Sequence, residues 1–192
     1  MNPPLLTEAE LRQRIWVELQ RATQDRHHEW RTPVLATLGS DGTPQARSVV
    51  LRHANAQPAR LTFYTDERSP KVAEIVANPC VSLVFWSKRL RWQLRVRADM
   101  SVKTSGPEVV AAWAQVNQSA AAGDYLSASA PGDALPVTPT TPAAPDSADA
   151  QVAMHHLAVL TAQVQQMDWL ELSRGGHRRA VFDARTWEWR VP

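Results

Sequence analysis

Apolar residues near the start of the chain recur at helical spacing. Leu11, Ile15, Leu19 and Ala22 are three or four positions apart, so they fall on one face of a helix. Thr7 and the glutamate three positions later form a capping box, in which the two side chains satisfy each other's backbone donors. An amphipathic helix is therefore predicted over about residues 7–24.

From residue 33 onward, short β-branched segments and turn residues replace the helical spacing. Strands are predicted at 34–38, 45–53, 61–65, 80–86 and 90–98. The glycines within 39–42 supply the positive φ angles that a hairpin turn needs. Ser69 and Pro70 predict the start of a short helix, which Asn78-Pro79 ends, and another helix is predicted from about 105 to 117.

The last third of the chain changes character twice. Five prolines among Ala, Ser, Thr and Asp over 123–147 predict a mobile surface loop or lid. Helical spacing then predicts a helix through Ala153, Leu157, Leu160, Val164 and Met167. Strands are predicted at 168–173, 178–184 and 187–191. The whole pattern predicts a mainly β fold in one domain over residues 1–192, a small antiparallel β-barrel decorated by α-helices.

Composition excludes several classes of function. The net charge of +2 gives no argument for a polyanionic partner, so nucleic acid is not expected. Cys80 is the only cysteine and no stretch approaches the roughly 18 apolar residues that span a bilayer, so a cytoplasmic protein without a membrane partner is expected. Phosphate-loop and dinucleotide fingerprints, metal-ligand spacing and a Ser-His-acid set are missing from the sequence. Neither a bound metal nor a catalytic side chain is therefore expected.

Basic residues gather in two groups at strand ends and turns. Arg47 and Arg52 bracket an apolar strand and, being five positions apart, should face opposite sides of it. The second group runs from a strand end into a helix N-terminus and comprises Tyr64, Thr65, Arg68, Ser69 and Lys71. Backbone N–H groups and the helix dipole reinforce the charge of Lys71 there. Arg47 and Lys71 together predict a two-sided site for a phosphate group.

Several motifs in this order resemble the pyridoxamine 5'-phosphate oxidase-like family of FMN-binding split barrels. They are Arg47-Ser-Val-Val-Leu-Arg52, Phe63-Tyr64-Thr65 with Ser69-Pro70-Lys71, Asn78-Pro79-Cys80-Val81-Ser82-Leu83, Gln93, and Trp169 ten positions before Arg179. The resemblance covers about 30–117 well and 165–192 more loosely. It implies an antiparallel split β-barrel, FMN as cofactor, and an oxidoreductase in which the flavin carries the chemistry.

The resemblance also assigns residues to the cofactor. The implied cofactor-binding residues are Arg47, Ser48, Val49, Val50, Arg52, Tyr64, Thr65, Arg68, Ser69, Lys71, Gln93, Trp169 and Arg179. Arg47 and Lys71 would bind the phosphate, and the backbone at 49–50 would lie along the isoalloxazine ring. Arg52 would lie near the ring and a small-molecule substrate. Gln93 would reach the flavin from the dimer side, with Trp169 and Arg179 from the partner subunit, which implies a homodimer with sites at its interface.

Departures from the family pattern bear on the substrate. Pro70 replaces a phosphate-binding arginine, for which Arg68 is the nearest substitute. The residues aligned with the family's Tyr, Arg and Ser at the substrate phosphate are Trp113, Asn117 and Ala121. These losses argue against vitamin B6 phosphate as the substrate. A flavin carrier or sensor without turnover is one alternative, and a nucleic-acid-binding barrel that uses the stripe of Arg91, Arg95 and Arg97 is a weaker one.

Overall fold

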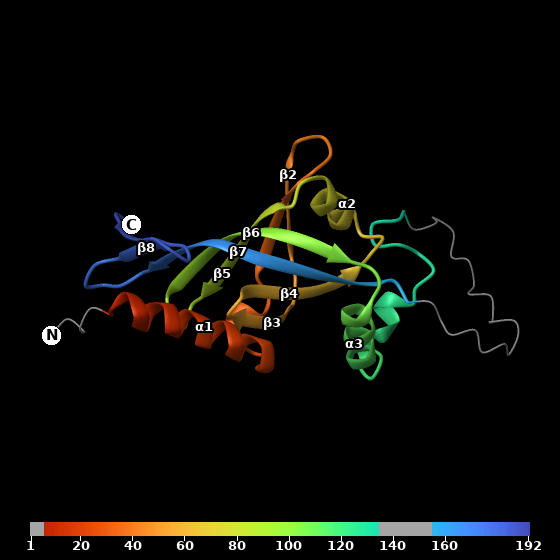
Figure 1. Ribbon diagram of the computed structural model, residues 1–192, viewed down its shortest axis with the longest axis horizontal. Helices are drawn as coiled ribbons and strands as arrows, with labels where there is room; N and C mark the ends of the chain where they lie inside the picture. The colour runs from red at the N-terminus through yellow and green to blue at the C-terminus, as the bar shows by residue number, and fades with distance from the viewer. Residues whose placement is uncertain (1–5, 135–154) are drawn as a thin grey trace, which may run out of the picture.

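A computed structural model describes residues 6–134 and 155–192 as an antiparallel β-sheet with a few helices (Figure 1). The strands are β1 (Val34–Leu38), β2 (Pro44–Ser48), β3 (Leu51–Ala56), β4 (Ala59–Asp66), β5 (Cys80–Ser87), β6 (Trp92–Lys103), β7 (Leu157–Glu171), β8 (Arg178–Phe182) and β9 (Trp187–Arg190). The helices are α1 (Glu8–Gln24), α2 (Pro70–Ala77) and α3 (Pro107–Val116), with short 3-10 turns η1 (Glu29–Arg31) and η2 (Ala120–Tyr125). None of the described helices is long and apolar enough to cross a membrane.

The two ends of the main sheet are joined by only two residues. The strand order is β2-β1-β5-β6-β7-β4-β3, with β8 and β9 added beside β7. In a flat sheet the six spacings between β2 and β3 would separate them by about 29 Å. Val49 and Val50, which connect these strands, can span only about 10 Å. The sheet must therefore curl until its edges almost meet, and it remains open because β2 and β3 do not pair. We call the link 49–50 the seam.

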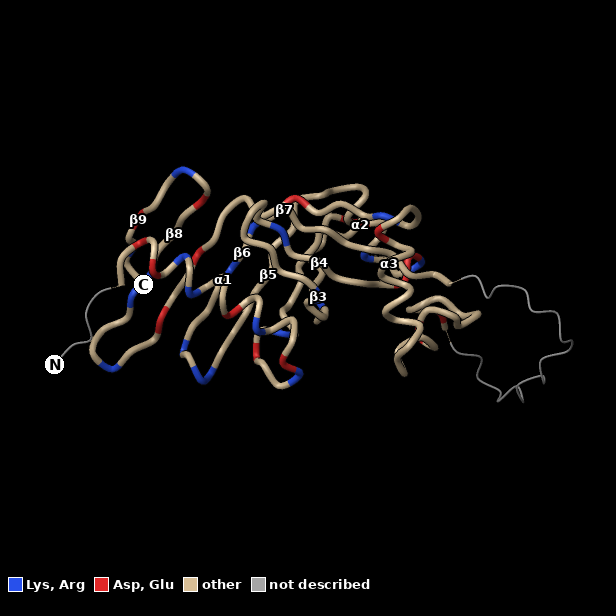
Figure 2. The backbone as a smooth tube through the Cα atoms, turned by 60° about the horizontal axis from the view of Figure 1, so that its bottom comes forward, with Lys and Arg blue, Asp and Glu red and all other residues tan. Residues whose placement is uncertain are grey.

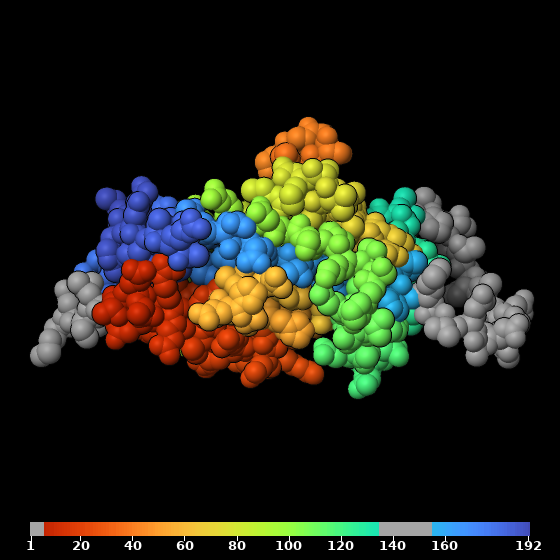
Figure 3. Space-filling view, viewed as in Figure 1, coloured from red at the N-terminus to blue at the C-terminus, as the bar shows by residue number. Residues whose placement is uncertain are grey.

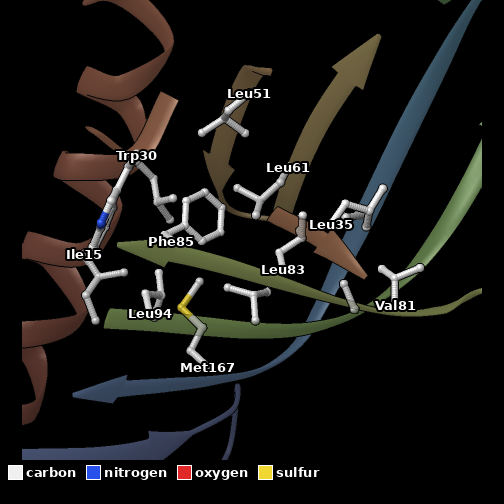
Figure 4. Packing of buried hydrophobic residues seen from close by; sticks show 14 of the residues in the cluster. Ile15, Trp30, Leu35, Leu51, Leu61, Val81, Leu83, Phe85, Leu94 and Met167 are labelled. Atoms are coloured by element: carbon white, nitrogen blue, oxygen red, sulfur yellow. The ribbon is translucent and has the colours of Figure 1, made fainter. Parts of the chain in front are cut away.

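Helix α1 covers one end of the curled sheet with the apolar face that its spacing predicts. Leu11, Ile15, Leu19 and Ala22 are fully buried, and the capping box at Thr7 is formed. Figure 4 shows Ile15 and Trp30 beside Phe85, Leu94 and the other inward-pointing residues of the sheet. Burying such apolar side chains contributes about 1.5–3 kcal/mol each, so this core fixes the curvature that brings the edges together.

A second, smaller core lies at the opposite end of the molecule. It joins α3, η2 and the start of β7 through Val109, Ala112, Val116, Tyr125, Leu157 and Val159. Tyr64 of β4 and Trp113 of α3 pack against it. This core holds η2 beside the end of β4, on the right-hand side of Figure 1.

The prediction of a helix through 153–167 is wrong. The structure has strand β7 from Leu157 onward, while Ala153 lies outside the described residues. The first four residues of β7 are all buried, because β4 pairs on one side, β6 on the other, and α3 covers one face. A strand buried on both faces loses its alternation, and a continuous apolar run does not distinguish helix from strand.

Most of the other predicted elements are confirmed with small shifts of their ends. The predicted strand 90–98 extends to Lys103 as β6, and the predicted strand 168–173 is the last part of β7. The predicted strand 45–53 is divided at the seam into β2 and β3. Gly42 has the expected positive φ of 79° in the β1–β2 turn. Of the predicted loop 123–147, the described residues 123–134 form the end of η2 and a series of turns, and the remainder lies outside the described residues.

Candidate functional site

The predicted phosphate site lies where β4 ends and α2 begins. Lys71 is in the first turn of α2, and its Nζ donates to Thr65 Oγ1 at 3.0 Å and to Ser69 Oγ. Ser69 occupies the N-cap position, but its hydroxyl makes no cap bond to the helix. Two hydroxyls, one ammonium and an uncapped helix start therefore converge, which is the donor set that a phosphate group requires.

Arg47 reaches this place from β2, the edge strand that pairs with β1. Its Nη2 donates to Glu74 Oε2 at 2.8 Å, and its Nη1 donates to Thr37 Oγ1. Burial lowers the pKa of Lys71, and the nearby charge of Arg47 lowers it further. Arg47 is therefore close enough to disfavour the charge of Lys71, and an anion between the two cations would be favoured. The structure thus brings Arg47, Thr65, Ser69 and Lys71 together, as the sequence predicts, and they fit the phosphate end of FMN.

The seam follows Arg47 in the chain, and the residues predicted to lie along the isoalloxazine ring are in it. Ser48 is exposed at the end of β2, Val49 is buried and Val50 is half-buried. The backbone N–H of Val49 bonds to the carbonyl of Pro33 at 3.0 Å, outside the strand ladders. The seam is open and its two residues are valines, so it offers an extended backbone flanked by apolar side chains, which suits a flat aromatic ring.

Beyond the seam, Arg52 lies among aromatic side chains. Its Nε is buried without a hydrogen-bond partner among the described residues, and its Cζ lies 5.5 Å from the centroid of the Tyr64 ring. Tyr64 Oη is 3.0 Å from His53 Nε2. Burial raises the pKa of Tyr64 and of Tyr125, while burial and the charge of Arg52 lower the pKa of His53. Protonated phenols and a neutral imidazole therefore surround a guanidinium that has an unused donor.

Arg68 is near the phosphate cluster in sequence but is engaged elsewhere. It forms a two-point ion pair with Asp66, with its Nη2 2.7 Å from Oδ2, and donates to backbone carbonyls of 127–129. Burial raises the pKa of Asp66, but the bonds and charge of Arg68 outweigh this effect and lower it. The structure does not bring the Arg68 side chain into the Arg47–Lys71 cluster through any bond among the described residues.

The C-terminal residues assigned to the cofactor lie away from this cluster and on different faces of the sheet. Trp169 is fully buried in the core, where the centroids of its ring and the Trp92 ring are 5.3 Å apart. Arg179 pairs across the ladder with Leu170, the residue after Trp169, so Arg179 lies on the face of the sheet opposite to Trp169. Its Nη2 donates to Asp168 Oδ2 at 2.8 Å. Gln93 of β6 is half-buried, and Arg179 and Gln93 both neighbour Leu170 on this outer face.

Some residues of the site are missing from the sequence prediction. Thr37 and Glu74 hold Arg47, and Tyr125 lies against Arg52. Glu74 is one helical turn after Lys71, so the periodicity of α2 offered a weak signal for it. Tyr125 interrupts a polar and alanine-rich segment, and only the fold brings it to β3.

The residues aligned with the family's substrate side carry no positive charge. The Trp113 ring stacks on His155 with centroids 4.4 Å apart, Asn117 is the C-cap of α3, and Ala121 is in η2. The basic stripe on β6 is partly paired, because Arg95 binds Asp168. Arg91, with a φ of 57°, lies in the turn before β6. In the backbone view of Figure 2, Lys and Arg positions are interspersed with Asp and Glu positions along the chain.

Comparisons with known proteins agree with this geometry. Residues 13–104 match the model of the family described as pyridoxamine 5'-phosphate oxidase, FMN-binding domain. The pyridoxine/pyridoxamine 5'-phosphate oxidase of Erythrobacter litoralis is 38% identical over 98 residues, covering 51% of this chain and 43% of the relative. The enzyme of that name from Microcystis aeruginosa is 36% identical over 82 residues, covering 43% and 37%. The chain therefore spans less than half the length of these curated relatives.

Solved structures extend the likeness to the whole fold. A pyridoxamine 5'-phosphate oxidase-related, FMN binding protein from Nostoc punctiforme superposes with a TM-score of 0.70 at 23% identity, covering 97% of this chain and all of the other. PhzG from Burkholderia lata superposes with a TM-score of 0.67 at 16% identity, covering all of this chain and 95% of the other. Residues 13–104 therefore match the FMN-binding domain of the pyridoxamine 5'-phosphate oxidase family, and the chain shares its open split-barrel fold with FMN-binding proteins of that kind.

Proposed function

We propose that this protein is an FMN-dependent oxidoreductase that acts on a small substrate. The observation that carries the proposal is the convergence of Arg47 and Lys71 on the uncapped start of α2, next to the open seam. FMN supplies the redox chemistry when it is bound. Arg47, Lys71, Thr65 and Ser69 bind its phosphate, and the seam lies along its ring.

The substrate lies on the side of Arg52. This guanidinium offers a buried donor that has no hydrogen-bond partner among the described residues, and the phenols of Tyr64 and Tyr125 beside it are donors whose pKa values burial raises. These groups favour a substrate with an anionic or hydrogen-bond-accepting group. Trp113 and Asn117 replace a denser set of donors. With one cation here, the site binds a phosphate dianion less well than a site with additional arginines would, which argues against pyridoxamine phosphate, the substrate in the name of the curated relatives.

We also propose a homodimer with the cofactor sites at its interface. The outer face of β1 and β5 exposes apolar residues, with Val34 39% and Trp86 46% exposed. Trp86 pairs across the ladder with Gln93, so this apolar surface adjoins the residue assigned to the partner's flavin. Aromatic residues on such a surface are typical anchors of an interface.

Purification and cofactor release test the first proposal. The protein should be yellow, and denaturation should release FMN rather than FAD or riboflavin. Reduction of the bound flavin by NADH or NADPH under anaerobic conditions, followed by reoxidation in air, would establish redox competence. A colourless protein that does not take up added FMN would refute the proposal.

Turnover assays test the substrate. Pyridoxamine phosphate should be oxidised far more slowly than by a curated relative assayed in parallel. Arg52→Gln should lower turnover of the true substrate by a larger factor than it weakens FMN binding. Oxidation of pyridoxamine phosphate at the relative's rate would refute the substrate argument and leave the cofactor proposal intact.

A further inference from the structure

Arg68 fastens a distant segment of the chain to the turn between β4 and α2. Its guanidinium donates to three successive backbone carbonyls, those of Ser127 at 2.9 Å, Ala128 at 3.2 Å and Ser129 at 3.3 Å. It also grips Asp66 through Nε at 3.0 Å and Nη2 at 2.7 Å. All three guanidinium nitrogens are engaged, which a lysine ammonium cannot reproduce.

The fastened segment runs along the candidate cofactor site. It begins after Tyr125, which lies beside Arg52, and at its far end Gly132 approaches Pro70 at the start of α2. A Cβ on Gly132 would lie 3.8 Å from Cγ of Pro70. In Figures 1 and 3 this segment, in teal, lies against the yellow-orange end of β4. Residues 127–133 therefore extend from the substrate end of the site to its phosphate end.

Few other bonds hold this segment in place. Within the described residues, every hydrogen bond between 127–129 and another part of the chain comes from Arg68. The bonds between Ala130 and Asp133 lie inside the segment. Before it, the carbonyl of Tyr125 accepts from the backbone N–H of His156 at 2.8 Å. Removing Arg68 would thus release the segment without breaking the sheet.

Arg68 also controls a charge beside the phosphate cluster. Asp66 is only 6% exposed and acts on Lys71, whose pKa its charge raises. Without Arg68, this carboxylate would be an uncompensated negative charge near an incoming phosphate. The ion pair therefore removes a repulsion while it fixes the backbone.

We propose that Arg68 is a positioning residue, which holds 127–133 as a wall of the FMN site and neutralises Asp66, and that it is not a phosphate ligand. The proposal rests on the function proposed above. It assigns to Arg68 a role different from replacing the arginine that Pro70 displaces.

The test compares Arg68→Ala and Arg68→Lys with wild type in two measurements. Stopped-flow fluorescence gives the release rates of FMN and of riboflavin, which lacks the phosphate. Elastase, which cleaves after small residues, reports exposure of 127–130 in the apo protein. Arg60→Ala is the matched control, because Arg60 is exposed on β4, the strand that precedes the turn with Arg68, and bonds only to Gln163 among the described residues.

Both Arg68 variants should release riboflavin about tenfold faster. Arg68→Lys keeps the positive charge beside Asp66, so it should speed the release of FMN by a similar factor, whereas Arg68→Ala leaves Asp66 unpaired and should speed the release of FMN further. Elastase cleavage at 127–130 should rise at least as much, while the melting temperature stays close to that of Arg60→Ala. Faster release of FMN with unchanged release of riboflavin in both variants would show that Arg68 acts on the phosphate alone and would overturn the proposal. Full rescue by Arg68→Lys, or unchanged cleavage, would overturn the fastening role. Because cleavage is measured without cofactor, failure of wild type to bind flavin would refute only the proposed function.

Discussion

Replacing Arg47 should weaken FMN by more than one lost contact, because Glu74 is left behind. Arg47 donates to Glu74 at 2.8 Å, and the carboxylate side chain is only 12% exposed. Loss of a charge-assisted bond to the phosphate costs about 1.5–3 kcal/mol. The unpaired carboxylate adds repulsion of about 1–2 kcal/mol at the effective dielectric of a partly buried site. Arg47→Ala should therefore raise the Kd for FMN by roughly 100-fold to several thousandfold.

The double variant Arg47→Ala, Glu74→Gln separates the two contributions. It removes the carboxylate charge while keeping a side chain of similar shape, so it should recover about tenfold of the lost affinity. Isothermal titration with FMN and with riboflavin provides the measurement. Riboflavin should bind all three proteins within about threefold, because it carries no phosphate.

Two results would contradict this account. Unchanged FMN affinity in Arg47→Ala would remove Arg47 from the phosphate site. Equal affinities of the single and the double variant would show that Glu74 does not act on the phosphate. The wild-type ratio of FMN to riboflavin affinity sets the scale against which both are judged.

Three further predictions concern charge and assembly. Burial and Arg47 lower the pKa of Lys71 below its ordinary 10.5. The affinity for FMN should therefore be full at neutral pH and fall as pH rises through that lowered pKa. In FMN titrations at a series of pH values, Lys71→Arg should abolish this fall. Burial raises the pKa of Asp168, but Arg179 and Arg95 outweigh burial and lower it below 3.8. This stabilisation is present above 3.8 and is lost as pH falls through the folded-state value, so Asp168→Asn should cost about 1 kcal/mol in urea unfolding at neutral pH and little in strong acid. Trp86→Arg should weaken the proposed dimer by about 2 kcal/mol, visible by light scattering, and an unchanged dimer would exclude that face as its interface.

The fold could be predicted from the sequence wherever one face of an element meets water. The alternation along β6 and the spacing of α1 both record a boundary between core and solvent. The start of β7 meets no such boundary, because β4 and β6 pair with its two sides and α3 covers one face. Its type follows from tertiary pairing, which local periodicity does not encode.

Some residues of the candidate site could likewise be predicted from the sequence and others could not. Arg47 and Lys71 could be predicted because each lies near the end of an element, where a cation can help to bind an anion. Glu74 and Tyr125 could not be assigned, since their partners are far away in sequence. Trp169 and Arg179 are ten positions apart, yet that spacing did not reveal that one lies in the core and the other on the outer face.

The seam at Val49 and Val50 also decides how the molecule comes apart. It connects the two edge strands of the main sheet, each of which is held by a single neighbouring strand. A cofactor that contacts Arg47 in β2 and Arg52 in β3 ties both edges at once, so its loss loosens them together. The freed edges then present unpaired backbone groups side by side, a template for pairing with another chain. Depletion of FMN should thus lead to aggregation as well as inactivity, and flavin supply during expression should govern the yield of intact protein.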